Sequence, residues 1–404
     1  MNNNKKSFQT RAIHAGSEPD PTTGSHVAPI YRTSTFVMEN VEEAIKAGYG
    51  DTEGKYYAYT RYGNPTVHAV QRKIAALEHA EACLMAASGM GAITTALLAV
   101  LSAGDHIVAA DTVYGGTFGF IKNILPRFGI EATIVSTIGD GVENIRGAIK
   151  PNTKIVYVES PCNPTLAITD IKKAAEIAHE SGALLYVDNT FATPYLQQPL
   201  LLGADIVLHS ATKYLNGHGD LIGGAIVGSK KIIHKMDSDF MKWMGGIMSP
   251  ADAATLSKGI QTLGVRMDVH CSNAKKVAEF LDNHDMVEKV LYPGIKSHPG
   301  HEIAKKQMKD FGGMMSFNVR GGFEAGKLLM DTVKVFSLAT SLGNIDSLIQ
   351  HSASMSHASM TKEEREAVGI ADGQVRLSIG IEDVKDIIED LDQALNHVRK
   401  ELNL

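Results

Sequence analysis

Short apolar runs and helical segments alternate through the middle of the chain. Aliphatic runs between polar residues predict buried strands, and they fall at residues 82–86, 106–110, 132–135, 154–159, 183–188, 204–210 and 223–228. Apolar residues at helical spacing predict helices at residues 65–78, 92–101, 117–128 and 171–179. Because strands alternate with helices, we expect an α/β fold whose mostly parallel sheet is covered by helices on both faces.

The pattern changes after about residue 250. Helical spacing runs from 252 to about 283, with Gly259 and Gly264 as candidate interruptions. Apolar runs follow at 314–319 and 333–336, then a strand-like segment at 375–378 and an amphipathic helix at 384–400. These elements predict a smaller second domain of α+β type. The division we expect is an arm at 1–62, a large domain at 63–255 and a C-terminal domain at 256–404.

The first 62 residues are irregular, because Pro19, Pro21, Pro29 and several glycines interrupt any long element. They still contain apolar residues, and tyrosines gather towards residue 62. A segment this apolar is expected to dock on a surface rather than to remain a free tail.

Composition narrows the function classes. The chain has 404 residues and a formal net charge of -6, which argues against binding nucleic acid through phosphate neutralisation. Its three cysteines form no Cys-x-x-Cys pair, so a reducing compartment is expected and no metal site is predicted. The polar start and the absence of about 18 consecutive apolar residues predict neither a secretory signal nor a membrane span. We therefore expect a cytoplasmic protein.

The most informative stretch surrounds Lys213. A strand-like run that begins at Ala204 ends in Ser210, Ala211 and Thr212, and the lysine follows directly. A lone lysine in a loop is most often a surface residue. Beside two hydroxyls at the end of a strand, however, a lysine can form a Schiff base while the hydroxyls bind a phosphate. Pyridoxal phosphate requires both.

A second candidate phosphate site lies between a predicted strand and a predicted helix. Ser88, Gly89, Met90 and Gly91 form this turn, where backbone N–H groups and the helix dipole favour an anion. Many such turns contain glycine only for packing. A dinucleotide motif would need a third glycine at position 94, which is Thr94, so that alternative is not supported.

Three further polar residues suit the same cofactor or an amino-acid substrate bound to it. Asp188 ends a strand and could pair with a protonated pyridine nitrogen, although most aspartates in such positions are caps or solvated ends. Asn163 could donate to the phenolate oxygen of the ring, or simply form an Asn-Pro turn. Arg376 could bind an amino-acid carboxylate in bidentate geometry, although a surface role is the more common one.

The chain resembles the transsulfuration family of pyridoxal-phosphate enzymes, from about residue 12 to residue 395. The motifs that carry the resemblance are Tyr59-Thr60-Arg61-Tyr62-Gly63-Asn64-Pro65-Thr66, Ser88-Gly89-Met90-Gly91-Ala92-Ile93, Val187-Asp188-Asn189-Thr190, Ser210-Ala211-Thr212-Lys213-Tyr214 and Val375-Arg376-Leu377-Ser378. This family has the type I fold of pyridoxal-phosphate enzymes. It includes methionine γ-lyase, cystathionine γ-lyase and γ-synthase, and O-acetylhomoserine sulfhydrylase.

The resemblance implies a role for each matching residue. Lys213 would bind the cofactor covalently and transfer protons, Tyr114 would stack on the ring and assist the leaving group, and Asp188 would complete the catalytic set. The residues implied to hold the phosphate are Gly89, Met90, Ser210 and Thr212. Arg376 and Ser341 would meet the substrate carboxylate. Tyr59 and Arg61 would reach the cofactor of a neighbouring subunit, in a homotetramer built from two dimers with shared sites.

The positions that vary within the family give a mixed answer on substrate. Thr340 and Ala58 stand where cystathionine γ-lyases can have glutamate, so an uncharged substrate such as methionine or homocysteine is favoured. Gly116 opposes this, because methionine γ-lyases typically have cysteine there, and Trp243 lies in a stretch that also differs from theirs. The prediction is a γ-eliminating C–S lyase, with cystathionine γ-lyase or γ-synthase and O-acetylhomoserine sulfhydrylase as alternatives. A binding protein without turnover is disfavoured, because it would not need Tyr114, Asp188, Lys213 and Arg376 together.

Overall fold

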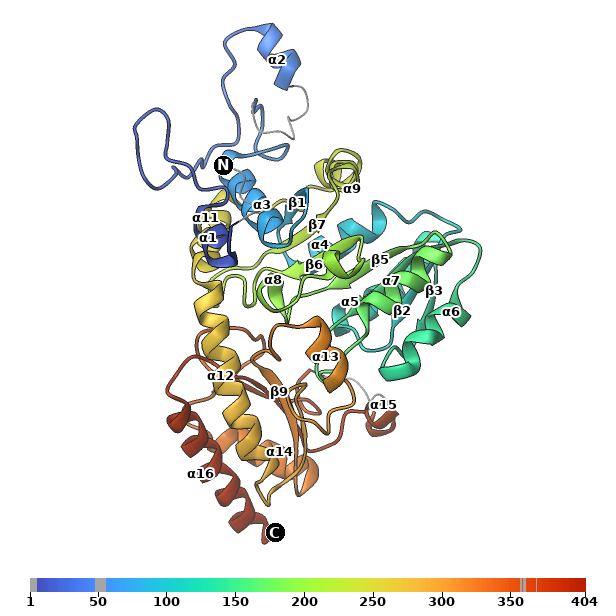
Figure 1. Ribbon diagram of the computed structural model, residues 1–404, viewed down its shortest axis with the longest axis vertical. Coiled ribbons are helices and arrows are strands. Elements are labelled where there is room, and N and C mark those ends of the chain that lie inside the picture. Colours follow the sequence, from blue (N-terminus) through green and yellow to red (C-terminus); the bar gives the residue numbers. More distant parts are fainter. Residues whose placement is uncertain (1–5, 48–55, 357, 359–360, 368) are drawn as a thin grey trace.

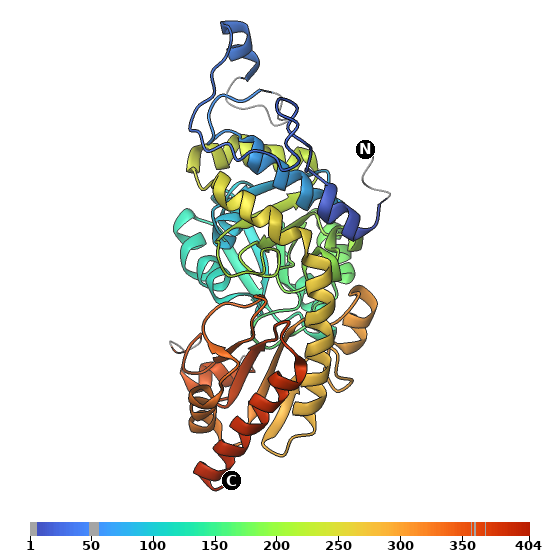
Figure 2. The same cartoon turned by 90° about the vertical axis from the view of Figure 1, so that its left-hand side faces the viewer.

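The computed structural model describes residues 6–47, 56–356, 358, 361–367 and 369–404. Figures 1 and 2 show an elongated molecule, with the N-terminal arm at one end, a large α/β layer in the middle and a smaller C-terminal unit at the other end. Within the described residues, we find no helix that has both the length and the apolarity of a membrane span.

A seven-stranded sheet forms the large layer, as the alternating pattern predicts. Its order is β1 (Ala82–Ala86), β7 (Gly224–Gly228), β6 (Ile206–Ser210), β5 (Leu184–Asp188), β4 (Thr153–Glu159), β2 (His106–Ala110) and β3 (Glu131–Val135). The strands from β3 to β6 pair in parallel, whereas β7 is antiparallel to both of its neighbours. The expected mostly parallel sheet is therefore confirmed.

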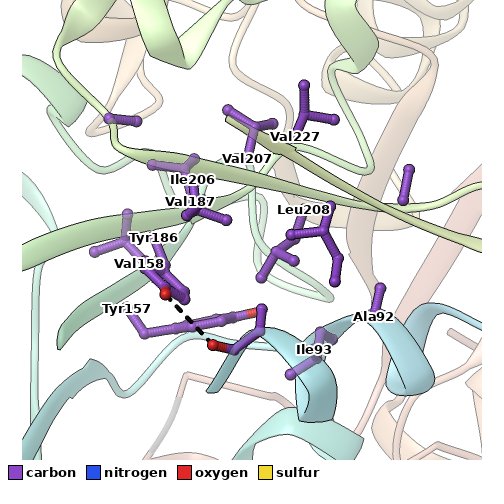
Figure 3. Close-up of a cluster of buried hydrophobic side chains, with 14 of the residues drawn as sticks. Ala92, Ile93, Tyr157, Val158, Tyr186, Val187, Ile206, Val207, Leu208 and Val227 are labelled. Atoms are coloured by element: carbon purple, nitrogen blue, oxygen red, sulfur yellow. Dashed lines mark hydrogen bonds between the residues drawn. The ribbon is translucent and has the colours of Figure 1, made fainter. Parts of the chain in front are cut away.

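Helices cover this sheet. Those of the large layer are α3 (Pro65–Leu77), α4 (Gly89–Leu98), α5 (Gly115–Gly119), α6 (Asn144–Ala148), α7 (Ile171–Glu180), α8 (Thr193–Leu196), α9 (Lys230–Met236) and α10 (Lys242–Met244). Figure 3 shows the core between strand and helix, where Tyr157, Tyr186 and Leu208 lie on the side of the sheet that faces Ala92 and Ile93 of α4. The hydroxyl of the fully buried Tyr186 donates to the Ala96 carbonyl (3.3 Å), so even the polar tip of this side chain has a partner.

One helix prediction in this layer is wrong in detail. Residues 117–128 were expected to form one helix, but the segment divides into α5, a π-helical turn at Phe120–Ile124 and a 3₁₀ turn at Leu125–Phe128. The physical reason is local, because Pro126 cannot donate an intrahelical hydrogen bond and Gly129 then takes a left-handed conformation (φ 71°) that ends the segment.

A five-stranded sheet forms the C-terminal unit. Its order is β10 (Ser337–Leu338), β11 (Leu348–His351), β12 (Gln374–Ser378), β9 (Met314–Val319) and β8 (Val287–Leu291). The accompanying helices are α13 (His301–Gln307), α14 (Gly322–Thr332), α15 (Lys362–Ala367) and α16 (Val384–Leu402). A second apolar cluster fills the space between this sheet and its helices.

The long helical stretch near residue 260 is interrupted, but not at Gly259 or Gly264, which were the expected positions. It forms α11 (Pro250–Gln261) and α12 (Leu263–Asp282), separated only by Thr262. Gly259 lies inside α11, at a point where the helix passes close to another part of the chain. A Cβ at this position would come within 2.3 Å of the Asn216 carbonyl oxygen, so a larger residue would clash. The glycine thus permits close packing rather than a break. Helix α12 runs from the large layer into the C-terminal unit beside α16 (Figures 1 and 2) and contributes to both apolar clusters.

Most of the arm projects from the rest of the chain, whereas its first helix packs beside α3 and α11 (Figure 1). It contains α1 (Phe8–His14), α2 (Val41–Ala47) and an extended path in which Thr35 pairs with Tyr59. Many of its apolar side chains are exposed in a single chain; Val37 is 99% exposed and Ile45 is 73% exposed. The three-part domain division remains a prediction.

Candidate active site

The ends of β5 and β6 bring two predicted residues together. Asp188 Oδ1 accepts hydrogen bonds from the backbone N–H (3.0 Å) and the hydroxyl (2.6 Å) of Thr190. The same hydroxyl oxygen accepts from the backbone N–H of Ser210 at 2.8 Å. Burial raises the pKa of Asp188, although the Thr190 bonds oppose this. Thr190, to which no role was assigned from the sequence, therefore links the carboxylate to the candidate phosphate-binding strand end.

Lys213 lies in the loop after β6, as the sequence predicts. Its Nζ donates to Ser341 Oγ at 2.8 Å. Burial, assisted by the positive charge of Arg376, lowers the pKa of Lys213 to about 8. The neutral fraction of this amine near pH 7 is therefore much larger than that of an ordinary lysine.

The C-terminal unit contributes Arg376 to the same place. This residue lies in β12 and is 6% exposed. Its Nη1 donates to Asn163 Oδ1 (2.8 Å) and its Nη2 donates to the Ser341 carbonyl (2.6 Å). Burial lowers the pKa of Arg376 to about 10, so the guanidinium is still cationic near neutrality. Ser341 thus connects the lysine with the arginine, and its φ of +96° is a strained conformation for a residue with a side chain.

The turn at Gly89 also reaches this site. Ser88 caps α4 by accepting from the backbone N–H of Gly91 (2.9 Å). A Cβ on Gly89 would lie 2.9 Å from Ser210 Cβ, so only glycine allows this helix start to approach β6 so closely. Thr212 sits on the same edge, where its hydroxyl accepts from the backbone N–H of Gly223 at 3.0 Å.

Tyr114 and Met90 lie beside each other above the sheet edge. A Cβ on Gly116 would come within 2.5 Å of the Tyr114 ring and 3.1 Å of Met90 Sδ. The tyrosine side chain is about half exposed, as expected for a group that contacts a ligand. Gly116 therefore lets the ring lie close to the backbone.

Glu159 is a residue that reasoning from the sequence missed. It ends β4, and its carboxylate accepts from the backbone N–H groups of Tyr114 (2.6 Å) and Asn163 (3.2 Å). Burial and the neighbouring charge of Asp188 raise its pKa well above the ordinary value. The available signal was an acid at the end of a buried strand, and Glu159 fixes the loops that carry two predicted site residues.

Tyr59 and Arg61 have a different set of contacts. Arg61 donates to the Lys242 carbonyl and to the Tyr62 hydroxyl (3.1 Å), and its guanidinium lies 4.5 Å from the centre of the Tyr62 ring. Tyr59 is 42% exposed. The chain therefore brings together Lys213, Asp188, Asn163, Ser341 and Arg376, but holds these two arm residues elsewhere.

The assembled groups fit pyridoxal phosphate. The start of α4 offers backbone N–H groups close to the Ser210 hydroxyl, which suits a phosphate. A buried lysine with a lowered pKa suits covalent binding of an aldehyde. Asp188 is buried and, within the described residues, makes no ion pair, so its carboxylate is available to a protonated ring nitrogen.

Comparison with known proteins gives consistent matches along the chain. Residues 9–396 match a family model described as "Cys/Met metabolism PLP-dependent enzyme". An L-methionine gamma-lyase of Fusobacterium nucleatum subsp. polymorphum is 50% identical over 98% of this chain and 100% of its own length. A cystathionine gamma-lyase of Bacillus subtilis is 46% identical over 96% of this chain and 99% of its own. The crystal structure of metB from Corynebacterium glutamicum superimposes with a TM-score of 0.91, at 45% identity, over 98% of this chain and 100% of that one.

Proposed function

Since this chain belongs to the Cys/Met metabolism family of pyridoxal-phosphate-dependent enzymes, we propose that it cleaves the C–S bond of methionine or homocysteine by γ-elimination. The cofactor is pyridoxal 5'-phosphate and the substrates are small amino acids. With methionine, the overall reaction consumes one water and yields methanethiol, 2-oxobutanoate and ammonia. The observation that carries the proposal is the meeting of Lys213 and Arg376 at Ser341.

Each residue of the site can be given a part in this reaction. The start of α4, with Ser210 and Thr212, would hold the phosphate, and Asp188 would hold the ring nitrogen. Bound pyridoxal phosphate supplies an electron sink for the carbon next to the amino group. Lys213 would accept the proton from that carbon, because its lowered pKa leaves a neutral fraction near pH 7.

Orientation of the substrate would come from the C-terminal unit. Arg376 would bind the carboxylate as a bidentate fork, and Asn163 and Ser341 fix the guanidinium beforehand. Tyr114 stands at the exposed side of the site, where its hydroxyl could protonate the departing sulfur.

The preference for an uncharged substrate rests on two positions. Thr340 and Ala58 place no carboxylate where the distal ammonium of cystathionine would need one. A buried ammonium without a partner costs several kcal/mol. Gly116 is the observation that favours the cystathionine enzymes instead, because it is the residue we associate with them at that position.

A substrate panel tests the proposal. Purified protein loaded with pyridoxal phosphate is incubated separately with methionine, homocysteine, cysteine and cystathionine, while 2-oxo acid and thiol release are measured. We expect 2-oxobutanoate from methionine or homocysteine, together with methanethiol from the first and hydrogen sulfide from the second. The kcat/KM should be at least about tenfold higher than for cystathionine. A preference for cystathionine would establish the alternative lyase. No turnover of any of them would contradict the lyase function.

The exposed arm supports a shared site in a homotetramer of two dimers. Side chains as apolar as Val37 and Ile45 would be covered if the arm packs on a partner. Tyr59 and Arg61 would then reach the phosphate in the partner's site, which explains why their contacts within one chain lie away from Lys213. The cytoplasmic location also remains a prediction.

Mixing two inactive variants tests the shared site. Arg61→Ala and Lys213→Ala should each lose activity, but a mixed dimer would have one site with both residues intact. Under conditions of subunit exchange, we expect about a quarter of the wild-type activity to return, because half of the dimers are mixed and each has one complete site. If labelled subunits demonstrably exchange and no activity returns, the arm serves its own chain.

A further inference from the structure

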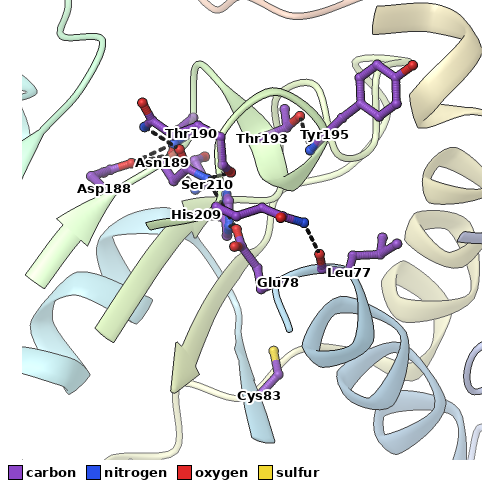
Figure 4. Close-up of polar contacts among 12 residues, drawn as sticks. Leu77, Glu78, Cys83, Asp188, Asn189, Thr190, Thr193, Tyr195, His209 and Ser210 are labelled. Carbon is purple, nitrogen blue, oxygen red and sulfur yellow. Dashed lines mark hydrogen bonds and ion pairs between the residues drawn. The ribbon is translucent and has the colours of Figure 1, made fainter. Parts of the chain in front are cut away.

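A buried polar pair lies directly behind the sheet edge that carries the candidate site. Glu78, which follows Leu77 as the C-cap of α3, accepts a hydrogen bond at Oε1 from His209 Nε2 at 2.6 Å. Both side chains are fully buried. The same oxygen accepts from the amide of Asn189 at 3.2 Å. Figure 4 shows Glu78 pointing up from α3 towards His209, beneath Asp188, Thr190 and Ser210.

The alternation of side chains along β5 and β6 explains why Glu78 and His209 lie on the face of the sheet opposite the site. Successive side chains of a strand point to opposite faces, so Asp188 and Ser210 face the site whereas their neighbours Asn189 and His209 face the core. On the site side, Thr190 links Asp188 to Ser210. On the core side, Glu78 links Asn189 to His209. The two strand ends are therefore clamped from both faces.

The contacts of Glu78 with Asn189 and His209 on the core side of the sheet are not explained by stability alone. Removing a polar or ionic pair from water costs free energy, and a well-packed apolar pair of similar size is often at least as stable. Within the described residues, Glu78 Oε2 and His209 Nδ1 are buried without hydrogen-bond partners, which adds to the cost. What the pair contributes is a fixed relation between the end of α3 and the ends of β5 and β6.

We propose that Glu78 is a positioning residue for the cofactor, acting through His209 and Asn189 on Ser210 and Asp188. The proposal rests on the proposed function only in that pyridoxal phosphate binds at this edge. Glu78 holds the two strand ends at the spacing that a phosphate at Ser210 and a ring nitrogen at Asp188 both require.

The charge of His209 matters to Asp188. Burial raises the pKa of Asp188, while the positive charge of His209 lowers it. The other groups that act on this carboxyl are Thr190 and Tyr157, which favour its ionised form by hydrogen bonding, and Glu159, which lies opposite it in β4. Loss of the Glu78 carboxylate would weaken its hold on His209, so that His209 no longer offsets the effect of burial on Asp188 and this carboxyl shifts towards its neutral form.

The test is Glu78→Gln, because glutamine keeps the shape and one acceptor oxygen but removes the charge. We expect the affinity of the apoenzyme for pyridoxal phosphate to fall about tenfold or more. In the reconstituted protein, the pH at which the visible absorption changes should move upward by about one unit. The reason is that a cofactor ring without an ionised partner loses its own positive charge. The Nζ of Lys213, which would join the cofactor, then keeps its proton to higher pH. Both readouts are independent of turnover, so they stand even if the substrate assignment fails.

Asp390→Asn is the matched control. Asp390 is a buried carboxylate in α16, and its Oδ2 accepts from the backbone N–H groups of Lys334 (3.0 Å) and Val335 (2.8 Å), in the C-terminal unit. This variant should lower the Tm while leaving cofactor affinity and the absorption transition unchanged. If Glu78→Gln also leaves both unchanged, Glu78 is merely structural and the proposal is wrong.

Two further measurements cover the case in which Glu78→Gln does not fold. His209→Gln removes the other half of the pair and should produce the same two shifts, whereas wild-type values would overturn the proposal. In the unaltered chain labelled with ¹⁵N-histidine, the proton shared with Glu78 should give a downfield resonance that moves when pyridoxal phosphate is added to the apoenzyme. No such response would contradict a link between the pair and the cofactor.

Discussion

Replacing Lys213 with alanine should abolish covalent cofactor binding and turnover together. The variant is expected to lack the visible absorption of lysine-bound pyridoxal phosphate and to lose at least about 10³-fold in kcat, because the covalent attachment and the proton acceptor are the same amine. The buried position of Nζ and its lowered pKa of about 8 are the basis of this expectation. Absorption spectra and the release of 2-oxo acid, measured on one preparation, provide the check.

Lys73→Ala separates this effect from the general loss of a buried lysine. Lys73 is fully buried, its pKa is also lowered to about 8, and its Nζ donates to the carbonyls of Ala12 (2.7 Å) and Ile13 (3.0 Å). This control should lower the Tm and retain the visible absorption of the folded protein. Activity retained in Lys213→Ala, or absorption lost equally in both variants, would contradict the assignment of Lys213.

Replacing Arg376 with alanine should remove recognition of the substrate carboxylate. Two charge-assisted hydrogen bonds are lost, at about 1.5–3 kcal/mol each, so we expect kcat/KM for the amino acid to fall by roughly 10²–10⁴-fold. Arg376→Lys should recover only part of this loss, because an ammonium cannot form the planar fork. Steady-state kinetics give the ratio, and the visible absorption should show that the cofactor remains bound.

A substrate analogue without the carboxylate sharpens this result. The amine 3-(methylthio)propylamine should bind the wild-type protein and Arg376→Ala with similar affinity, because neither complex contains the bidentate contact. Arg11→Lys is the matched control, since Arg11 is also buried (4% exposed) but donates to the Ala76 carbonyl at the end of α3. If kcat/KM fell as much in Arg11→Lys as in Arg376→Lys, the effect of replacing Arg376 would come from a less stable fold and not from a lost contact with the carboxylate.

Some residues of the predicted site could be identified from the sequence pattern, whereas the role of others became clear only in the structure. Lys213, Asp188 and Gly89 were found because each follows a strand-like run, and the carboxyl ends of parallel strands meet at one edge of a sheet. Arg376 was a candidate for binding a carboxylate, but its role rested on the family motif, since a single strand-like segment of a second domain does not show what the side chain faces. Its contacts with Asn163 and Ser341 join residues that lie 213 and 35 positions away in the chain.

The residues that were missed share one property. Glu159 and Glu78 are acids within or beside predicted elements, where solvated ends are the common role. Their importance follows from burial and from bonds to distant backbone or side chains, such as the contact between Glu78 and His209 across 131 positions. Local sequence does not encode such pairing, because it arises only when separate elements pack.

By itself, the sequence determined the alternation of strands and helices, the place of the lysine at a strand end and the family motifs. These features are local, since aliphatic runs and helical spacing report burial within one element. Only the tertiary structure decided that α11 ends at Gln261 and that Ser341 joins Lys213 to Arg376. The physical reason is that these outcomes depend on how distant elements pack, as with the hydrogen bonds from β12 to the loops of the large layer.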